Sequence, residues 1–141
     1  MNYDPVFDKW HEECGVFGVY DRTIDVARYV YWGLFALQHR GQESAGIAVT
    51  DGHDVELKKG MGLLTEAIKE LPSLPSYMGT GHVRYSTTGS NNPRNIQPLV
   101  IHYQGGQIAV AHNGNLTNAL SIRKRLEADG SIFQTTMDSE V

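Results

Sequence analysis

Cysteine, long apolar runs and basic clusters are all scarce in this 141-residue sequence. Its single cysteine, Cys14, excludes a disulfide within the chain. No apolar stretch approaches the roughly 18 residues that span a bilayer. Twelve Lys and Arg against sixteen Asp and Glu leave a net charge of −4, and the largest basic cluster, Arg123-Lys124-Arg125, is typical of the solvated face of a helix. These shortages argue against nucleic acid and membrane partners and favour a cytoplasmic globular domain.

The thirteen residues before Cys14 have no basic segment followed by an apolar one, so they are not a secretory signal. Removing them would leave Cys14 with a thiol and a free α-amine. That amine could relay the thiol's proton without a histidine. A lone cysteine in a soluble protein is more often a small buried hydrophobic residue, and Cys14 taken alone favours that interpretation.

Apolar periodicity and turn residues predict an α+β fold, because pairs of strands alternate with helices. The predicted strands cover residues 14–20, 44–50, 55–59, 77–85, 99–103 and 107–112, and the predicted helices cover residues 24–40, 63–71 and 117–128. A turn over 21–23 is expected to cap the first helix. Between the fourth and fifth strands, residues 86–98 are polar and rich in Asn and Pro, which favours a functional loop.

Several residues near predicted strand ends could carry chemistry. Arg84 could hold a carboxylate in two parallel hydrogen bonds, although an isolated arginine is more often a structural ion-pair partner. Asn113-Gly114 could donate to an oxyanion, yet Asn-Gly is also a common turn. Asp138 could bind an ammonium group or cap a helix beginning at Ser139. The six histidines form no close ligand pair, so we expect no metal site.

Five blocks of sequence decide between these alternatives. They are Cys14 to Gly18, Gln38 to Ile47, Gly81 to Thr87, His112 to Leu116 and Asp138 to Val141. Together, in this order and spacing, they resemble the class II glutaminase domain of the amidophosphoribosyltransferase family. The resemblance runs from Cys14 to Val141.

The resemblance implies an N-terminal nucleophile hydrolase fold, a four-layer αββα sandwich that is incomplete in this fragment. Cys14 would attack the side-chain amide of glutamine, with its α-amine as the base. Asn113 and Gly114 would form the oxyanion hole. The substrate-binding residues implied by the resemblance are Arg84 for the α-carboxylate, Asp138 for the α-ammonium, Arg40 and Gly41 in the pocket wall, and Thr87 in a closing loop.

In this family, the ammonia converts phosphoribosyl pyrophosphate to 5-phosphoribosylamine, the first step of purine synthesis. We therefore expect residues 1–13 to be a leader removed on maturation and residues 14–141 to be the first part of the glutaminase domain. The phosphoribosyltransferase domain is absent from this chain. Magnesium, and in some members an iron–sulfur cluster, would belong to that missing part, with no cofactor in this segment. The intact protein would be a homo-oligomer.

Two other functions stay open at this point. Glucosamine-6-phosphate synthase, asparagine synthetase and glutamate synthase share the nucleophile and the Asn-Gly pair, so the ammonia acceptor could differ. Alternatively, the isolated segment is an inactive fragment that binds ligands at most. The sequence beyond Val141 distinguishes the acceptors, because each acceptor needs its own domain.

Overall fold

The computed structural model describes residues 14–85 and 92–141. The strands are β1 (Gly15–Tyr20), β2 (Ser44–Thr50), β3 (Val55–Met61), β4 (Met78–Arg84), β5 (Leu99–Tyr103) and β6 (Gly106–Val110). The helices are α1 (Val26–Ala36), α2 (Leu64–Ala67) and α3 (Ala119–Ala128), with short 3-10 turns η2 (Gln38–Arg40), η3 (Pro93–Asn95) and η4 (Asp138–Glu140). No helix in these ranges is long and apolar enough to cross a membrane.

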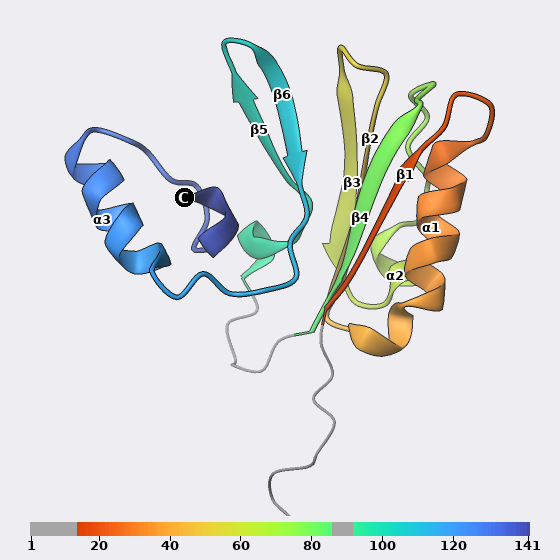
Figure 1. Ribbon diagram of the computed structural model, residues 1–141. Helices are drawn as coiled ribbons and strands as arrows, with labels where there is room; N and C mark the ends of the chain where they lie inside the picture. Colours follow the sequence, from red (N-terminus) through yellow and green to blue (C-terminus); the bar gives the residue numbers. More distant parts are fainter. Residues whose placement is uncertain (1–13, 86–91) are drawn as a thin grey trace, which may run out of the picture.

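Two antiparallel sheets form the centre of the fold. The larger has the strand order β1-β4-β2-β3, and the smaller is the β5-β6 hairpin. Figure 1 shows α1 and α2 on one side of the larger sheet, the hairpin on the other side and α3 beyond it. Lys59 on β3 links the larger sheet to the segment before the hairpin, because its Nζ donates to the carbonyl of Ile96 at 2.9 Å. The layers therefore follow the order helix, sheet, sheet, helix.

The core lies between α1 and the larger sheet. On α1, Val26, Val30 and Leu34 recur at helical spacing and are buried, and they pack with alternate residues of β2 such as Ile47. Two glycines on β4 let the helix approach closely: a Cβ at Gly79 would lie 2.8 Å from Val26, and one at Gly81 would lie 2.6 Å from Leu34. The remaining side chains of β2 and β4 face the second layer, where the site lies.

Most predicted elements are confirmed, and the clearest difference is the helix expected over 63–71. Only its first turn, Leu64–Ala67, is helical. Leu64 and Ile68 are buried and Leu71 packs against the same core, so the chain after Ala67 runs across the core instead of continuing the helix. Pro72 also disfavours a helical conformation at Leu71.

Two helix starts and one loop also differ from the expectation. The cap of α1 is Asp25, whose Oδ1 accepts from Arg28 N at 3.1 Å, whereas Asp21 accepts from Thr23 in the preceding turn. Helix α3 begins at Ala119 because the chain first turns through Leu116 to Asn118. Of the expected loop over 86–98, residues 86–91 lie outside the described residues, and η3 forms in the remainder.

His82, on the face of β4 that looks away from α1, is buried at 1% exposure. Among the described residues, neither of its ring nitrogens has a hydrogen-bond partner. Burial, with a further contribution from the positive Arg84, lowers the pKa of His82 from 6.5 to about 4. Folding therefore favours the neutral imidazole at neutral pH.

This burial predicts an acid-dependent loss of stability. Below pH 6.5 the unfolded chain binds a proton at residue 82, while the folded chain does not until the pH approaches about 4. Between pH 7 and 4.5, His82 should account for a loss of about 2 kcal/mol of unfolding free energy. Urea denaturation of wild type and His82→Gln at both pH values measures this loss. The wild type should lose more stability than the variant, and His102→Gln, at an exposed position on β5, should behave like the wild type.

Candidate active site

Cys14 lies at the edge of the larger sheet, directly before β1, with its side chain half-buried. The N–H of Tyr85 donates to Cys14 Sγ at 3.3 Å, and the thiol lies 3.5 Å from the carbonyl oxygen of the same residue. The β1-β4 register pairs Gly15 with Val83, so the next residues outward, Cys14 and Arg84, lie at the same end of the sheet. The strand pairing thus brings the nucleophile candidate and the arginine to one end of the sheet.

Two side chains from distant parts of the chain hold the backbone carbonyl of Cys14. Arg40 Nε donates to it at 3.2 Å, and Asn113 Nδ2 donates to it at 2.8 Å. Asn113 follows β6, so the hairpin brings its amide to the start of β1. A side-chain amide has two N–H donors, which leaves a second one for another acceptor. Next to it, Gly114 packs so closely on His112 that a Cβ would lie 2.6 Å from the imidazole Nε2.

Cys14, Asn113 and Gly114 line one cavity of about 550 Å³. Its lining includes five of the predicted site residues, namely Cys14, Arg84, Asn113, Gly114 and Asp138. They come from the start of β1, the end of β4, the segment after β6 and η4, which are far apart in the sequence. The fold therefore assembles the predicted thiol, cation, amide and carboxylate around a single volume.

Arg84 is the cationic side of the cavity. Its side chain is 18% exposed, Nη1 donates to the carbonyl of Asn95 at 3.2 Å, and Nε lies 4.0 Å from a carboxylate oxygen of Glu43. The contact with Glu43 is long, so it holds the guanidinium weakly compared with a bidentate ion pair. Arg84 thus keeps donors for a further anionic group.

Asp138 is the anionic side. It is the first residue of η4, whose cap position is Met137 and which has no side-chain cap hydrogen bond. Instead Oδ2 accepts from the N–H of Leu116 at 2.7 Å, and Oδ1 lies 3.6 Å from His112 Nδ1. The structure therefore disfavours the helix-cap alternative for Asp138. These contacts turn the carboxylate toward the Asn113-Gly114 segment.

Two other predicted substrate-binding residues lie away from this cavity. Arg40 and Gly41 are not among the cavity-lining residues of the described chain. The reason is that η2 follows α1 behind the sheet edge, where Gly41 packs against the backbone of Val83 and Arg84 and only the long Arg40 side chain reaches the carbonyl of Cys14. Thr87 lies outside the described residues.

Four further residues line the cavity although the sequence analysis did not place them in the site. They are Asn95, His112, Arg123 and Thr136. Asn95 was hidden in a polar loop, and Arg123 belonged to a basic cluster that we expected to face solvent. In the structure, Arg123 donates to the carbonyl of Met137 at 3.1 Å and lies over the ring of Phe133. An arginine on an otherwise solvated helix offers no sequence signal for that inward contact.

Comparison with known proteins agrees with this geometry. Residues 82–141 match the model of a glutamine amidotransferase domain. The amidophosphoribosyltransferase of Methanocaldococcus jannaschii is 50% identical over 91% of this chain, and that of Bacillus subtilis is 48% identical over 93%. Residues 82–141 thus match a glutamine amidotransferase domain, and the chain as a whole is similar to the amidophosphoribosyltransferases. It spans only about 28% of the length of both relatives.

The fold agrees with this similarity. The solved glutamine phosphoribosylpyrophosphate amidotransferase from Bacillus subtilis, complexed with ADP and GMP, aligns with a TM-score of 0.80 at 45% identity, over 89% of this chain and 27% of that one. A second solved structure, described as the allosteric regulatory enzyme of purine biosynthesis, aligns with a TM-score of 0.79 at the same identity. The expected N-terminal nucleophile hydrolase fold is confirmed.

Proposed function

We propose that this segment hydrolyses the side-chain amide of glutamine and that the complete protein passes the ammonia to phosphoribosyl pyrophosphate, forming 5-phosphoribosylamine. One observation carries the proposal: a thiol, an amide donor and two opposite charges line the same cavity. A free amino acid is a zwitterion, with a carboxylate suited to Arg84 and an ammonium suited to Asp138. When Arg84 and Asp138 hold the two charged groups of glutamine, Cys14 is the nucleophile available to its side-chain amide.

The chemistry we propose uses groups of the chain itself. Cys14 Sγ attacks the amide carbon, and the α-amine of a processed Cys14 takes up the thiol proton. The second N–H of the Asn113 amide and the backbone N–H of Gly114 stabilise the oxyanion. Collapse of the tetrahedral intermediate breaks the C–N bond, and the amine returns its proton to the departing ammonia. Water then attacks the thioester, which releases glutamate and restores the thiol.

The α-amine exists only after residues 1–13 are removed, because an internal cysteine carries an amide nitrogen that is not basic. We therefore include removal of this leader in the proposal. We also retain Arg40 as a positioning residue, since its bond to the Cys14 carbonyl holds the nucleophile at the edge of the sheet. Thr87 keeps its proposed part in closing the site over glutamine, which would exclude water from the ammonia.

The acceptor half of the reaction belongs to residues beyond this segment. Phosphoribosyl pyrophosphate binding, magnesium and assembly into a homo-oligomer are proposed for that part of the protein. An iron–sulfur cluster does not fit the segment, because its sequence has one cysteine, and the described residues contain no group of three His, Cys, Asp or Glu suited to a metal. No step at the Cys14 site runs through either group. Related amidotransferases with another acceptor are the second candidate, because the Cys14 site alone does not choose the acceptor.

Replacing the nucleophile tests the proposal. In the complete protein, Cys14→Ala should abolish synthesis of 5-phosphoribosylamine from glutamine, while synthesis from added ammonia should continue, because free ammonia bypasses the glutaminase site. Both rates are measured with phosphoribosyl pyrophosphate as the acceptor. Equal loss of the two activities would contradict a role confined to glutamine. Activity with ammonia and another acceptor would support the second candidate.

A pair of substitutions separates binding from transition-state stabilisation. Arg84→Lys keeps the positive charge and removes the guanidinium fork, so KM for glutamine should rise about tenfold or more with a smaller change in kcat. Asn113→Ala removes an oxyanion donor, so kcat should fall about a hundredfold or more. Steady-state glutaminase kinetics measure both. An unchanged KM in Arg84→Lys would assign the carboxylate to another residue, and an unchanged kcat in Asn113→Ala would reject the oxyanion role.

A further inference from the structure

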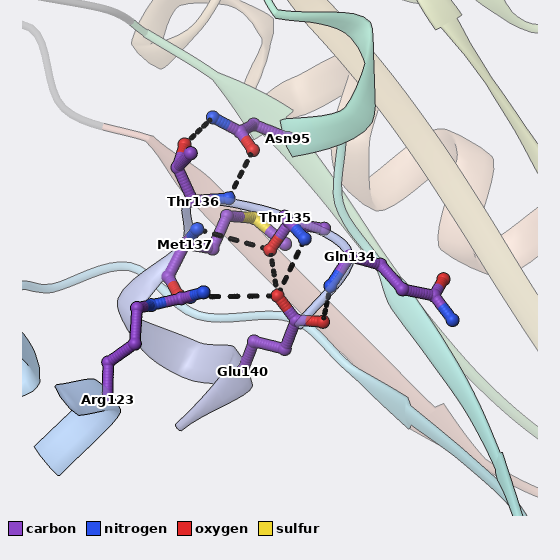
Figure 2. A network of polar contacts seen from close by, with 7 residues as sticks. All are labelled: Asn95, Arg123, Gln134, Thr135, Thr136, Met137 and Glu140. Carbon is purple, nitrogen blue, oxygen red and sulfur yellow. Dashed lines mark hydrogen bonds and ion pairs between the residues drawn. The ribbon is translucent and has the colours of Figure 1, made fainter. Parts of the chain in front are cut away.

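Asn95 lies between the two charged sides of the cavity and contacts both of the segments that carry them. Its backbone carbonyl accepts from Arg84 Nη1 at 3.2 Å. Its side-chain Nδ2 donates to Thr136 Oγ1 at 2.7 Å, and its Oδ1 accepts from the N–H of Thr136 at 3.2 Å, as Figure 2 shows. Asn95 is 5% exposed, so these bonds form with little competition from water.

Asn95 binds the segment 134–140 at Thr136, and Glu140 stabilises the same segment through separate hydrogen bonds. The Glu140 carboxylate accepts from Gln134 N at 2.6 Å, from Thr135 N at 2.7 Å and from the Thr135 hydroxyl at 2.6 Å. Arg123 Nη2 lies 3.7 Å from the same carboxylate, and Figure 2 shows this guanidinium beside the turn. Hydrogen bonds between its two ends thus hold the segment 134–140 in a turn, and Asp138 belongs to this turn.

These contacts also decide which carboxylate serves the substrate. Burial alone would raise the pKa of Glu140, but the hydrogen bonds from Thr135 and Gln134 and the charge of Arg123 outweigh it and lower that pKa. The Glu140 carboxylate is therefore already occupied by partners in and beside the turn. Asp138 has one short hydrogen bond, to Leu116, and a longer contact with His112. It is the carboxylate that can receive an ammonium group.

We propose that Asn95 is a positioning residue that fixes the separation of Arg84 and Asp138, and thereby the place of the substrate amide relative to Cys14. The inference rests on the proposed glutaminase function. A short path joins the two anchors: the Arg84 guanidinium, the backbone and amide of Asn95, Thr136, and then Asp138 two residues further along the chain. With both ends of the zwitterion held at a set distance, the amide reaches the thiol only in the correct alignment.

The test measures how well glutamine protects Cys14 in the mature, complete protein. Iodoacetamide alkylates the thiol, and the glutamine concentration that halves the alkylation rate reports binding without any acceptor. In Asn95→Ala this concentration should rise about tenfold, the value expected when two hydrogen bonds that hold the anchors are lost. The alkylation rate without glutamine should stay within about twofold of wild type, because Asn95 does not touch the thiol. KM for glutamine should rise in step, with kcat less affected.

Two further variants make the result specific. Thr136→Val removes only the hydroxyl and should raise the half-protecting concentration by about threefold. Combined with Asn95→Ala it should add little, since both remove the same link. Asn92→Ala is the matched control: Asn92 lies three residues earlier, and its side chain accepts from Arg94 N within the η3 turn. It should leave protection unchanged.

Each outcome decides the inference. If glutamine protects wild type and Asn95→Ala at equal concentrations, the positioning role is wrong while the proposed function stands. If glutamine fails to protect the wild type, the proposed function falls and the inference with it. An equal effect of Asn92→Ala would show general loosening of the η3 turn and overturn the role of Asn95. Should Asn95→Ala fail to fold, Thr136→Val decides alone, and unchanged protection there overturns the proposal.

Discussion

The antiparallel pairing of β1 with β4 is the constraint on which the site depends. Because Gly15 pairs with Val83, the residues just outside this pair, Cys14 and Arg84, meet at one end of the sheet. A shift by one residue would turn every side chain of β1 to the opposite face. Helix α1 opposes such a shift because it packs on both strands: its Gly33 lies against the Phe17 ring of β1, and Gly79 and Gly81 of β4 leave room for Val26 and Leu34. Helix packing on one face of the sheet therefore keeps Cys14 and Arg84 at the same end of the sheet.

The β5-β6 hairpin and the segments after it supply the remaining residues of the site. The hairpin returns the chain to Cys14, where Asn113 holds its carbonyl, and the turn closed by Glu140 brings Asp138 to the same cavity. These partners lie far from Cys14 in the sequence; Asn113, for example, is 99 residues away. The site forms only when both layers are in place. Loss of the second layer would leave a cysteine and an arginine without the Asn113 amide or the opposing charge of Asp138.

Local patterns predicted most of the fold, and motifs predicted five of the residues that line the cavity. Strand β2 was predicted with its observed bounds, because alternating small and β-branched residues end at a clear Asp-Gly turn. The helix over 63–71 was too long, since the core contacts of Ile68 and Leu71 override local helical preference. Asn95 had no signal at all. Its proposed role depends on a contact with Thr136, 41 residues away. The residues around Asn95 form a polar loop, and its sequence does not indicate that distant partner.

The central claim is that Cys14, freed from residues 1–13, is the nucleophile that forms a covalent intermediate with glutamine. Acid quenching of the complete protein during turnover, followed by digestion and mass spectrometry, tests this claim directly. The account predicts a γ-glutamyl thioester on a peptide whose first residue is Cys14. A glutamyl group on a different residue, or fully active protein in which Glu13 still precedes Cys14, would contradict it.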